Sequence, residues 1–422
     1  MALLRKLRQD GWYIKKSFPH FDMPLPFEEA KARVTNPQYV ATRSFWPFIG
    51  FVEKKRRFKK QSNTTIVKDK ERPLRYCSHH DGYIHAYYAH ELAKAYEKTI
   101  DARGIQDAII GYRKNLGTNI DMAKSAFDEI RKRGNCAVIA LDIEGFFESI
   151  DHAVLKSRLQ EVLGVERLST DWFKIFRSMT RYSWVEIEDL AERLKFDIEA
   201  PPRPLCSADE FRTKVRGGTS IVSTNTKVFG IPQGSPVSAA FSNVYMLNFD
   251  EACCRFAKET QAFYRRYSDD IILICDIDQI DATLKFINAE IIKLGPSMKI
   301  NGDKTEISEF KRAHDDALLC SKPATYLGLT FDGTKTYLRH RTVSRYYRRM
   351  TYASRHAASA AIQAGSDKVF MRKLYRELSH LGRQNFYSYA RLARDTLDDI
   401  APIRQLRRHF HILKRKVVTY GK

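Results

Sequence analysis

The stretch from Arg265 to Cys275 constrains this chain more than any other, and it reads Arg-Arg-Tyr-Ser-Asp-Asp-Ile-Ile-Leu-Ile-Cys. Two adjacent carboxylates, Asp269 and Asp270, interrupt aromatic and apolar residues, a pattern that predicts a strand, a tight turn and a second strand. Neighbouring side chains on a strand point to opposite faces, so at least one acid faces whatever the hairpin packs on. Burying such a pair is costly unless a cation compensates it, whereas acids at a solvated turn need no partner.

A second acid closes an apolar strand earlier in the chain. Residues 138–147 read Val-Ile-Ala-Leu-Asp-Ile-Glu-Gly-Phe-Phe, in which Asp142 follows the apolar run. Two acid-bearing strands can face one another in a sheet, and three carboxylates gathered there offer the oxygen ligands that divalent cations prefer. Two such cations support in-line phosphoryl displacement, because they stabilise both the attacking and the leaving oxygen.

Three motifs, in this order and spacing, resemble the successive polymerase motifs of reverse transcriptases. They are Asp142-Ile-Glu-Gly-Phe-Phe147, Gly230-Ile-Pro-Gln-Gly-Ser-Pro-Val-Ser238 and Tyr267-Ser-Asp-Asp270. The resemblance implies a right-hand polymerase, with fingers and palm of α+β architecture followed by a basic helical thumb. We expect an N-terminal extension at residues 1–50, fingers and palm at 51–333, and the thumb at 334–422.

The resemblance also implies which residues carry the chemistry. Asp142, Asp269 and Asp270 would hold two Mg²⁺ ions, for which Mn²⁺ can substitute, and the backbone carbonyl of Ile143 would complete a coordination shell. Lys304 matches the family's lysine near the leaving pyrophosphate and would act as a general acid, a role typically worth about 10²–10⁴-fold in rate. An exposed lysine without a catalytic role is the alternative at this position.

Residues 51–75 form a basic stretch, with ten lysines and arginines against three acids. We expect a strand at 64–67 and a turn at 68–74 that leads into another strand. By resemblance this is the fingers hairpin that grips the incoming triphosphate, and the alternative is a solvated charged hairpin. At the position of Phe147 the family places a residue beneath the sugar, where a ring would exclude a ribose 2′-hydroxyl. The residues expected to bind the nucleotide are Lys68, Lys70, Arg72, Arg113, Phe147 and Gln233.

The last fifth of the chain carries most of the positive charge. Residues 341–422 contain 19 lysines and arginines against 5 acids, a net charge of +14, whereas the whole chain has 72 against 50, a net charge of +22. This excess favours a nucleic-acid partner. We expect base stacking by the aromatic residues among these arginines, which are Tyr346, Tyr347, Phe386, Tyr387 and Tyr389. The expected grip on primer and template consists of Tyr326, Leu327, Gly328, Arg348 and Arg349.

Among reverse transcriptases, the unfused chain most resembles the bacterial defence-associated enzymes of the type 2 kind, within the group that includes group II intron and retron enzymes. That resemblance implies synthesis of cDNA from dNTPs on a partner non-coding RNA in antiviral defence. Retron enzymes carry Val-Thr-Gly in the thumb, and this chain has Thr342-Val343-Ser344 and no Val-Thr-Gly. An intron-type or retron-type enzyme, a template-independent or protein-primed polymerase, and a non-catalytic RNA-binding scaffold stay open as alternatives.

The cellular compartment follows from what the sequence lacks. The seven cysteines form no Cys-x-x-Cys pair, which is typical of reduced thiols in a reducing compartment. No run approaches the ~18 uninterrupted apolar residues of a membrane-spanning helix. The N-terminal Met-Ala-Leu-Leu-Arg-Lys has too short an apolar core for a signal peptide. We therefore expect a cytoplasmic protein with no membrane partner, and the resemblance to the defence-associated enzymes implies that the cytoplasm is bacterial.

Overall fold

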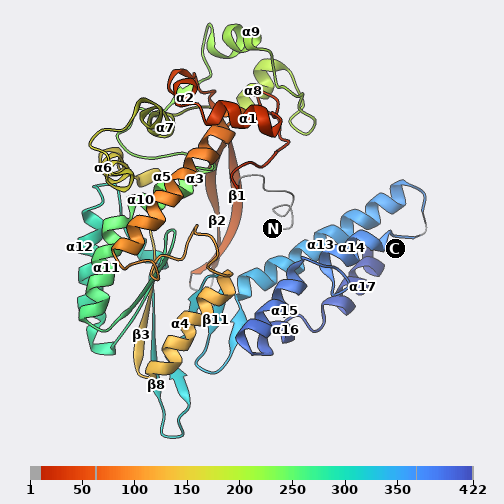
Figure 1. Ribbon diagram of the computed structural model, residues 1–422. Coiled ribbons are helices and arrows are strands. Elements are labelled where there is room, and N and C mark those ends of the chain that lie inside the picture. Colours follow the sequence, from red (N-terminus) through yellow and green to blue (C-terminus); the bar gives the residue numbers. More distant parts are fainter. Residues whose placement is uncertain (1–10, 62–63, 367, 421–422) are drawn as a thin grey trace.

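A five-stranded antiparallel sheet, here called the palm sheet, carries the acidic motifs (Figure 1). The computed structural model describes residues 11–61, 64–366 and 368–420, and the side chains of residues 55–70 are outside this description. The strand order of the palm sheet is β6-β7-β3-β8-β9. These strands are β6 (Phe263–Tyr267), β7 (Asp270–Cys275), β3 (Cys136–Asp142), β8 (Glu306–Arg312) and β9 (Leu318–Cys320).

Both faces of the palm sheet are covered, which explains the uninterrupted apolar runs of its central strands. In β3, Ala137, Ile139 and Leu141 belong to one hydrophobic core, and Val138, between Ala137 and Ile139, belongs to a second core on the other face. This alternation follows the two-residue period of a strand. The longer helices that contribute to the first core include α3 (His79–Ala102), α6 (His152–Leu163), α7 (Thr170–Thr180), α10 (Ser238–Tyr245), α11 (Leu247–Glu259) and α12 (Ile280–Ile292). Helix α4 (Asn119–Arg133) and part of the thumb cover the other face.

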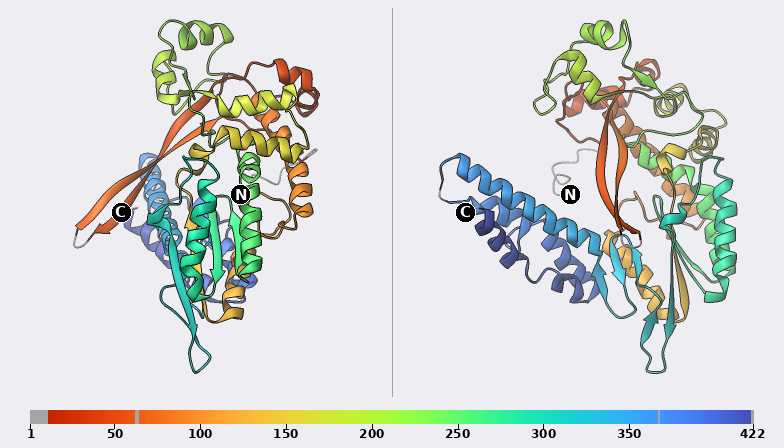
Figure 2. Two further views of the ribbon diagram at one scale, coloured as in Figure 1. Left: turned by 90° about the vertical axis from the view of Figure 1, so that its left-hand side faces the viewer. Right: turned by 180° about the vertical axis from the view of Figure 1, so that it is seen from behind.

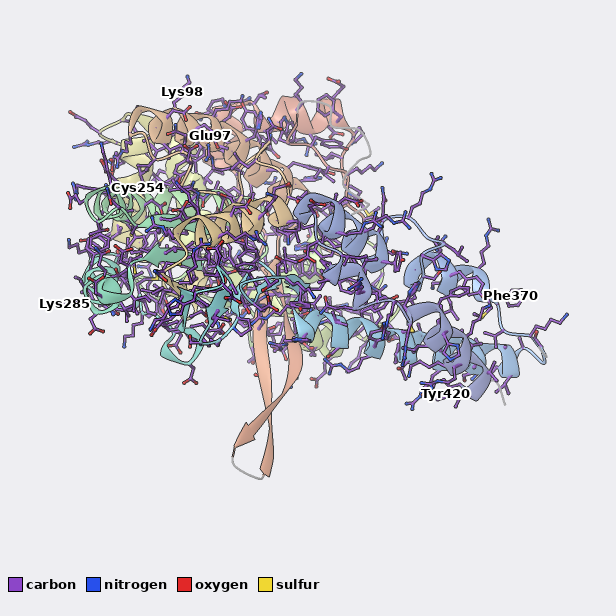
Figure 3. The ribbon with its side chains drawn as sticks, turned by 90° about the horizontal axis from the view of Figure 1, so that it is seen from below. Glu97, Lys98, Cys254, Lys285, Phe370 and Tyr420 are labelled. Carbon is purple, nitrogen blue, oxygen red and sulfur yellow. The ribbon has the colours of Figure 1, made fainter. Side chains whose placement is uncertain are left out.

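A four-stranded sheet of order β2-β1-β4-β5 forms the fingers. Strands β1 (Phe48–Gln61) and β2 (Thr64–Tyr76) pair along their length as a hairpin that projects far beyond the body (Figure 3). Strand β4 (Ser183–Glu186) runs parallel to the start of β1, and β5 (Ser223–Thr224) pairs with β4. A small core of its own joins this sheet to the segments α8 (Ile187–Leu194) and η2 (Phe211–Arg216), and the short helix α9 (Ala208–Glu210) directly precedes η2.

The prediction of a turn at residues 68–74 is wrong. These residues continue β2 and pair with β1, so that Pro73 lies opposite Val52 and Lys68 opposite Arg57. Proline is tolerated here because β2 is an outer strand of its sheet, where the missing N–H faces no partner strand. Regular pairing with β1 therefore outweighs the local turn signal of proline and charged residues.

The described part of the N-terminal extension packs on the body of the molecule. It contains α1 (Phe27–Val34) and α2 (Pro37–Thr42), and it contributes the buried side chain of Trp12 to the large core of the body. The residues at 11–50 thus act as part of the folded unit.

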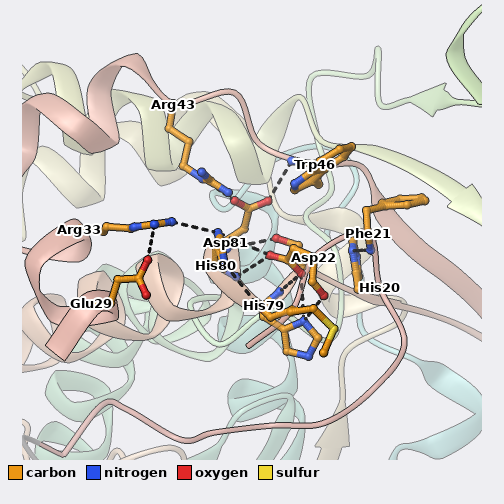
Figure 4. A network of polar contacts seen from close by, with 12 residues as sticks. His20, Phe21, Asp22, Glu29, Arg33, Arg43, Trp46, His79, His80 and Asp81 are labelled. Atoms are coloured by element: carbon orange, nitrogen blue, oxygen red, sulfur yellow. Dashed lines mark hydrogen bonds and ion pairs between the residues drawn. The ribbon is translucent and has the colours of Figure 1, made fainter. Parts of the chain in front are cut away.

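Figure 4 shows how this extension is fastened to the start of α3. The carboxylate of Asp22 accepts hydrogen bonds from the backbone N–H groups of His79 and His80, both at 2.9 Å. Beside it, Arg43 Nε donates to Asp81 at 2.8 Å. The first N–H groups of a helix have no partner within the helix, so Asp22 satisfies two groups that burial would otherwise leave unpaired.

A three-stranded sheet leads from the palm into the thumb, whose helices extend away from the palm (Figure 2). Its strands are β10 (Ala324–Tyr326), β11 (Leu329–Phe331) and β12 (Thr336–Leu338). The thumb helices are α13 (His340–Gln363), α14 (Met371–Leu378), α15 (Phe386–Leu397), α16 (Ala401–Arg404) and α17 (His409–Tyr420). The short remaining helices are α5 (Phe146–Ser149), η3 (Ile277–Gln279) and η4 (Gly302–Lys304).

The two expected domain boundaries fall at different kinds of position in the structure. The boundary between residues 333 and 334 falls in the turn between β11 and β12, and the boundary between 50 and 51 falls inside β1. The helical part of the thumb begins at His340 and the fingers sheet at Phe48. In the described part of the chain, no helix has both the length and the apolar character to cross a bilayer.

Candidate active site

The acidic motifs meet at one end of the palm sheet. Asp142 is the last residue of β3, Asp270 is the first of β7, and the two lie opposite one another across these antiparallel strands. Asp269 precedes Asp270 in the tight turn from β6 to β7, where Ser268 has a left-handed φ of 58°. The strand, turn and strand predicted around the adjacent acids are confirmed, and so is the facing strand that carries the third acid.

Burial, together with the clustering of acids, raises the pKa of both carboxyl groups in the turn. For Asp269 the largest cause is desolvation, and the charge of Asp142 adds to it. For Asp270, desolvation and then repulsion by Asp269 and Asp142 raise the pKa to about 6. Like charges held close together disfavour the ionised form, so this end of the sheet attracts cations.

Lys304 supplies one cation from within the chain. Its ammonium donates to Asp142 Oδ2 and forms an ion pair with it. The loop that carries this lysine is fixed to β3, because the N–H of Asn301 donates to the carbonyl of Asp142 at 2.8 Å. The lysine expected to be a general acid therefore lies at the acidic cluster, with its side chain 34% exposed.

The oxygen donors at this end of the sheet fit Mg²⁺, which prefers carboxylate and carbonyl ligands. The backbone pairing beside the acids uses the carbonyl of Asp142 and the N–H of Glu144, and so it does not engage the carbonyl of Ile143. Among the described residues, no three His, Cys, Asp or Glu side chains form a ready metal cage. Asp142 is ion-paired with Lys304 instead, so ligation by all the acids requires this lysine to move aside.

Phe147 and Gln233 lie on two segments that are joined beside the acids. The half-buried ring of Phe147 in α5 has its centroid 5.4 Å from that of Phe146. The carbonyl of Phe147 accepts a hydrogen bond from the N–H of Ile231 at 2.8 Å, and the carbonyl of Gln233 accepts one from the N–H of Arg75 at 3.0 Å. The Pro-Gln-Gly loop is thus held between α5 and the base of β2. The roles of Phe147 and Gln233 toward a nucleotide stay predictions.

Arg75 is a residue of this region that motif reasoning missed. Its guanidinium carbon lies 4.1 Å from the centroid of the Trp184 ring, and its Nη1 donates to the hydroxyl of Tyr182 at 3.1 Å. The loop approaches Arg75 so closely that a Cβ on Gly234, whose φ is 132°, would lie 2.4 Å from the Arg75 carbonyl oxygen. Only glycine fits there. Trp184 and Tyr182 are remote in sequence, so no local pattern reveals this stacked arginine.

The three basic residues expected on the fingers hairpin all lie on β2. Arg72 is exposed and is paired with Glu53 in the strand register. The side chains of Lys68 and Lys70 lie outside the described residues. Phosphate binding by this hairpin stays a prediction.

Arg113 has a structural role in this structure, and the nucleotide contact expected for it stays a prediction. Its Nε and Nη2 donate to the two carboxylate oxygens of Glu97 at 2.8 and 2.6 Å, and its Nη1 donates to the carbonyls of Gln106 and Ile109. The side chain is 8% exposed. A nucleotide would have to displace this fork of bonds, which ties the loop before Gly111 to helix α3. The sequence showed the arginine but not the distant glutamate that pairs with it.

Tyr326, Leu327 and Gly328 form the turn between β10 and β11. Leu327 and Gly328 have left-handed φ values of 46° and 88°, respectively. Asn119 Nδ2 donates to the carbonyl of Leu327 at 2.9 Å, and the N–H of Arg339 donates to the carbonyl of Gly328 at 3.0 Å. The turn is therefore fixed to α4 and to the start of the thumb. Because Tyr326 is buried, a primer end would meet the backbone of this turn and not that ring.

The two arginines expected to grip nucleic acid are exposed on helix α13. Arg348 lies on the outer face of the helix, and Arg349 Nη2 lies 3.5 Å from a carboxylate oxygen of Glu377 on α14. Both guanidinium groups are thus accessible to a polyanion. Their contact with primer or template stays a prediction.

Of the thumb aromatics expected to stack on nucleic acid, Tyr346 is buried and cannot do so, and stacking by the others stays a prediction. Tyr346 is buried, and its hydroxyl donates to the carbonyl of Leu378 at 2.6 Å. The helical period places Tyr346 on the inward face of α13 with Met350, while the arginines fall outside. The aromatic residues that pack partly buried against the same core are Tyr347, Phe386, Tyr387 and Tyr389. Tyr352, 71% exposed, is an aromatic residue that the helix does present to solvent.

The palm sheet with facing acids, the fingers hairpin and the helical thumb define a right-hand polymerase that transfers nucleotides. The chain belongs to the reverse transcriptase (RNA-dependent DNA polymerase) family, whose family model matches residues 58–331. A search of curated proteins gave no significant match.

Solved structures with a similar fold include yeast telomerases. The apo telomerase from Candida tropicalis truncated from its C-terminal domain is 12% identical, with a TM-score of 0.43, over 72% of this chain and 56% of that chain. Telomerase from Candida albicans in complex with a TWJ fragment of telomeric RNA is 12% identical, with a TM-score of 0.44, over 93% of this chain and 66% of that chain. The chain therefore spans less than two thirds of the length of these telomerases. At this level the likeness concerns the fold alone.

Proposed function

We propose that the protein synthesises DNA on an RNA template, with its active centre at the acidic end of the palm sheet. The observation that carries the proposal is the meeting of Asp142, Asp269 and Asp270 with Lys304 at this one end. Membership of the reverse transcriptase family supports the reaction class. Two Mg²⁺ or Mn²⁺ ions, held by the three carboxylates and the carbonyl of Ile143, would activate the primer 3′-hydroxyl and neutralise charge on the triphosphate.

The side chains around the acids have separate tasks in this proposal. Lys304 exchanges its ion pair with Asp142 for the phosphates of the nucleotide and donates a proton to the departing pyrophosphate. Arg72, with Lys68 and Lys70, binds the triphosphate from the fingers hairpin, because guanidinium and ammonium groups are strong phosphate donors. The ring of Phe147 excludes a ribose 2′-hydroxyl, and Gln233 hydrogen-bonds the nucleotide or the template-primer.

The proposed template is a dedicated non-coding RNA, and the proposed role is antiviral defence in the bacterial cytoplasm. The form Ile-Pro-Gln-Gly-Ser-Pro-Val-Ser of the central motif supports the kinship with defence-associated enzymes. The net charge of +14 over residues 341–422 supports a polyanionic partner of some size, since each neutralised phosphate adds to affinity.

Sequencing of the nucleic acid that copurifies with the protein tests this proposal. The intact protein, the variant Asp269→Ala/Asp270→Ala and the surface variant Asp278→Ala are each purified from cells together with the RNA that is co-expressed there. We expect one enriched RNA in all three, and complementary DNA only with the intact and surface-variant proteins. Loss of phage resistance with Asp269→Ala/Asp270→Ala alone would support the defence role.

Other outcomes would contradict parts of the proposal. Untemplated DNA together with random bound RNA would remove the dedicated template and favour a template-independent or protein-primed polymerase. DNA synthesis by the variant Asp269→Ala/Asp270→Ala would contradict the assignment of the active centre to the acidic end of the palm sheet.

A further inference from the structure

A fully buried ion pair lies directly behind the turn that carries Asp269 and Asp270. Arg266 on β6 and Asp250 on α11 both have side chains that are 0% exposed. Arg266 Nη2 donates to Asp250 Oδ2 at 2.5 Å, and its Nε donates to Asp250 Oδ1 at 2.6 Å. The same carboxylate accepts a hydrogen bond from the hydroxyl of Tyr264 at 2.6 Å. A buried charge pair of this kind needs several hydrogen bonds to offset its desolvation, and this one has them.

The remaining nitrogen of the guanidinium reaches the turn itself. Arg266 Nη1 donates to the carbonyl of Ser268 at 3.0 Å and lies 3.4 Å from Asn243 Oδ1. Ser268 is the residue with the left-handed φ of 58°, a conformation that a residue other than glycine adopts at a cost. The hydrogen bond from Arg266 therefore fixes the peptide group that follows the unfavourable left-handed φ of Ser268 in the turn.

A second segment holds the turn from its other side. Asn243 Nδ2 donates to the carbonyl of Gly111 at 2.9 Å. Gly111 lies so close to the turn that a Cβ there would be 2.6 Å from the backbone nitrogen of Ser268. The loop at Gly111 and the guanidinium of Arg266 thus enclose the same residue, and Asn243 contacts both.

Stability alone does not account for an ion pair at this place. Buried ion pairs are often replaceable by apolar residues of similar volume without loss of stability. An apolar pair would fill the same space behind the sheet but would leave the carbonyl of Ser268 without its donor. What the guanidinium supplies, and an apolar side chain cannot, is directed hydrogen bonding from one rigid group to both Asp250 and the turn.

We propose that Arg266, oriented by Asp250 and assisted by Asn243, is a positioning residue that sets the Ser268 peptide and thereby the direction of the Asp269 and Asp270 carboxylates. The inference rests on the proposed catalytic role of these two acids. It assigns no contact with substrate to Arg266, which acts through the turn. Displacement of catalytic groups by about 1 Å can cost about 10²-fold in rate, so loss of this bond should affect turnover more than binding.

The double variant Asp250→Leu/Arg266→Met tests the proposal, because it removes the charges together and keeps an apolar filling. We expect it to fold and to bind template-primer with wild-type affinity. Its kcat should fall at least tenfold, with little change in the KM for dNTP, and its half-maximal activity should require a higher Mg²⁺ concentration. The matched control is Tyr264→Phe, which removes one bond to Asp250 but leaves the bond from Arg266 to Ser268, and it should retain kcat within twofold.

A folded double variant with wild-type kcat and Mg²⁺ dependence would overturn the proposal. If the double variant does not fold, the variant Arg266→Lys tests the proposal instead. Its ammonium keeps the positive charge beside Asp250, but it cannot donate to that carboxylate and to the Ser268 carbonyl at the same time as the planar guanidinium does. A tenfold lower kcat at unchanged template-primer binding supports the proposal, and wild-type kinetics or failure of Arg266→Lys to fold overturns it. Asp269→Ala/Asp270→Ala, measured in parallel, separates the two inferences, since activity in that variant contradicts the catalytic assignment itself.

Discussion

The palm and the thumb both gather charged residues, but they hold them in opposite ways. Behind the acidic turn of the palm, Arg266 and Asp250 are fully buried, and the guanidinium donates to Asp250 and to the carbonyl of Ser268. On the thumb, Arg345 and Arg348 face solvent along the outer side of α13. Buried charges form hydrogen bonds of defined direction, so a single substitution has a large effect. Exposed charges contribute through their net charge, and salt screens them. Under the proposed function, we therefore expect the palm to determine the chemistry and the thumb to contribute affinity.

The largest effect should come from the acids at the end of the palm sheet. Asp142→Asn or Asp269→Asn keeps the shape of the side chain but removes the charge that binds divalent cations. Because cation binding contributes several kcal/mol to the transition state, we expect primer extension to fall by at least about 1,000-fold, with RNA binding retained. Steady-state primer extension and a filter-binding assay measure the two quantities. The exposed acid variant Asp278→Asn is the control, and activity within tenfold of wild type in either palm variant would contradict the assignment.

The next largest effect concerns Lys304. Its substitution by alanine removes the proposed proton donor, and we expect the rate of single-nucleotide addition to fall by about 10²-fold. Rapid-quench measurement of one addition separates this step from binding. Lys299→Ala, on the same loop and exposed, should leave the rate unchanged. A loss of RNA affinity with an unchanged chemical rate would show that Lys304 is a binding residue.

Phe147→Ala should relax the choice of sugar. Removal of the ring opens space for a 2′-hydroxyl, and steric discrimination in a pocket is worth roughly 10–200-fold. We expect the ratio of ribonucleotide to deoxynucleotide incorporation to rise about tenfold. Competition between rNTP and dNTP on one template measures it, and Phe146→Leu, which changes the buried neighbour, is the control. Unchanged sugar selection would leave Phe147 with a packing role only.

The thumb should respond to substitution in small and additive steps. Arg348→Gln removes one exposed charge, so we expect affinity for RNA to fall a few-fold and the slope of log K against log salt to become shallower by about one. The rate at saturating template should not change. Arg212→Gln removes an exposed arginine of the fingers and is the matched control. Equal effects of the two variants on the salt slope would show that the thumb surface has no special part in binding.

The smallest effect is on stability and depends on pH. Because the folded protein raises the pKa of Asp270 from 3.8 to about 6, it binds this proton more tightly than the unfolded chain does. The ionised group therefore costs stability as pH rises through this range. Without divalent cations, Asp270→Asn should raise the melting temperature at pH 7 by about 1–2 °C, and the gain should vanish below pH 4. Thermal melts across pH measure it, and a gain that is the same at all pH values would contradict this origin.

The sequence was informative where function and local pattern coincide. The paired acids at the β6–β7 turn, and Asp142 at the end of a facing strand, could be placed from apolar runs and from their resemblance to a known family. The basic character of the thumb followed from charge alone. Both patterns can be recognised without knowledge of long-range contacts, because a strand buried on both faces must be apolar and an exposed helix face must be polar.

The rest depends on partners that lie far away in the chain. Arg113 is buried because Glu97 on α3 pairs with it, and Arg75 is held by Trp184 of β4. Tyr346 became a core residue because the helical period turned it inward, a detail that an arginine-rich composition concealed. Local propensity likewise failed at Pro73, where pairing between strands decided the backbone. Each miss is a case in which tertiary context overrides a local signal.

The pairing of β4 with β1 also bears on how the molecule is made. Phe48 is matched with Trp184 in the fingers sheet, and palm strand β3 lies between them in the chain. A growing polypeptide cannot complete the first sheet until it has already produced part of the second. Contacts over such separations carry a large loop-closure entropy and form slowly. The fingers and palm therefore have to fold together. Cutting the chain between them should yield fragments that aggregate and do not fold independently.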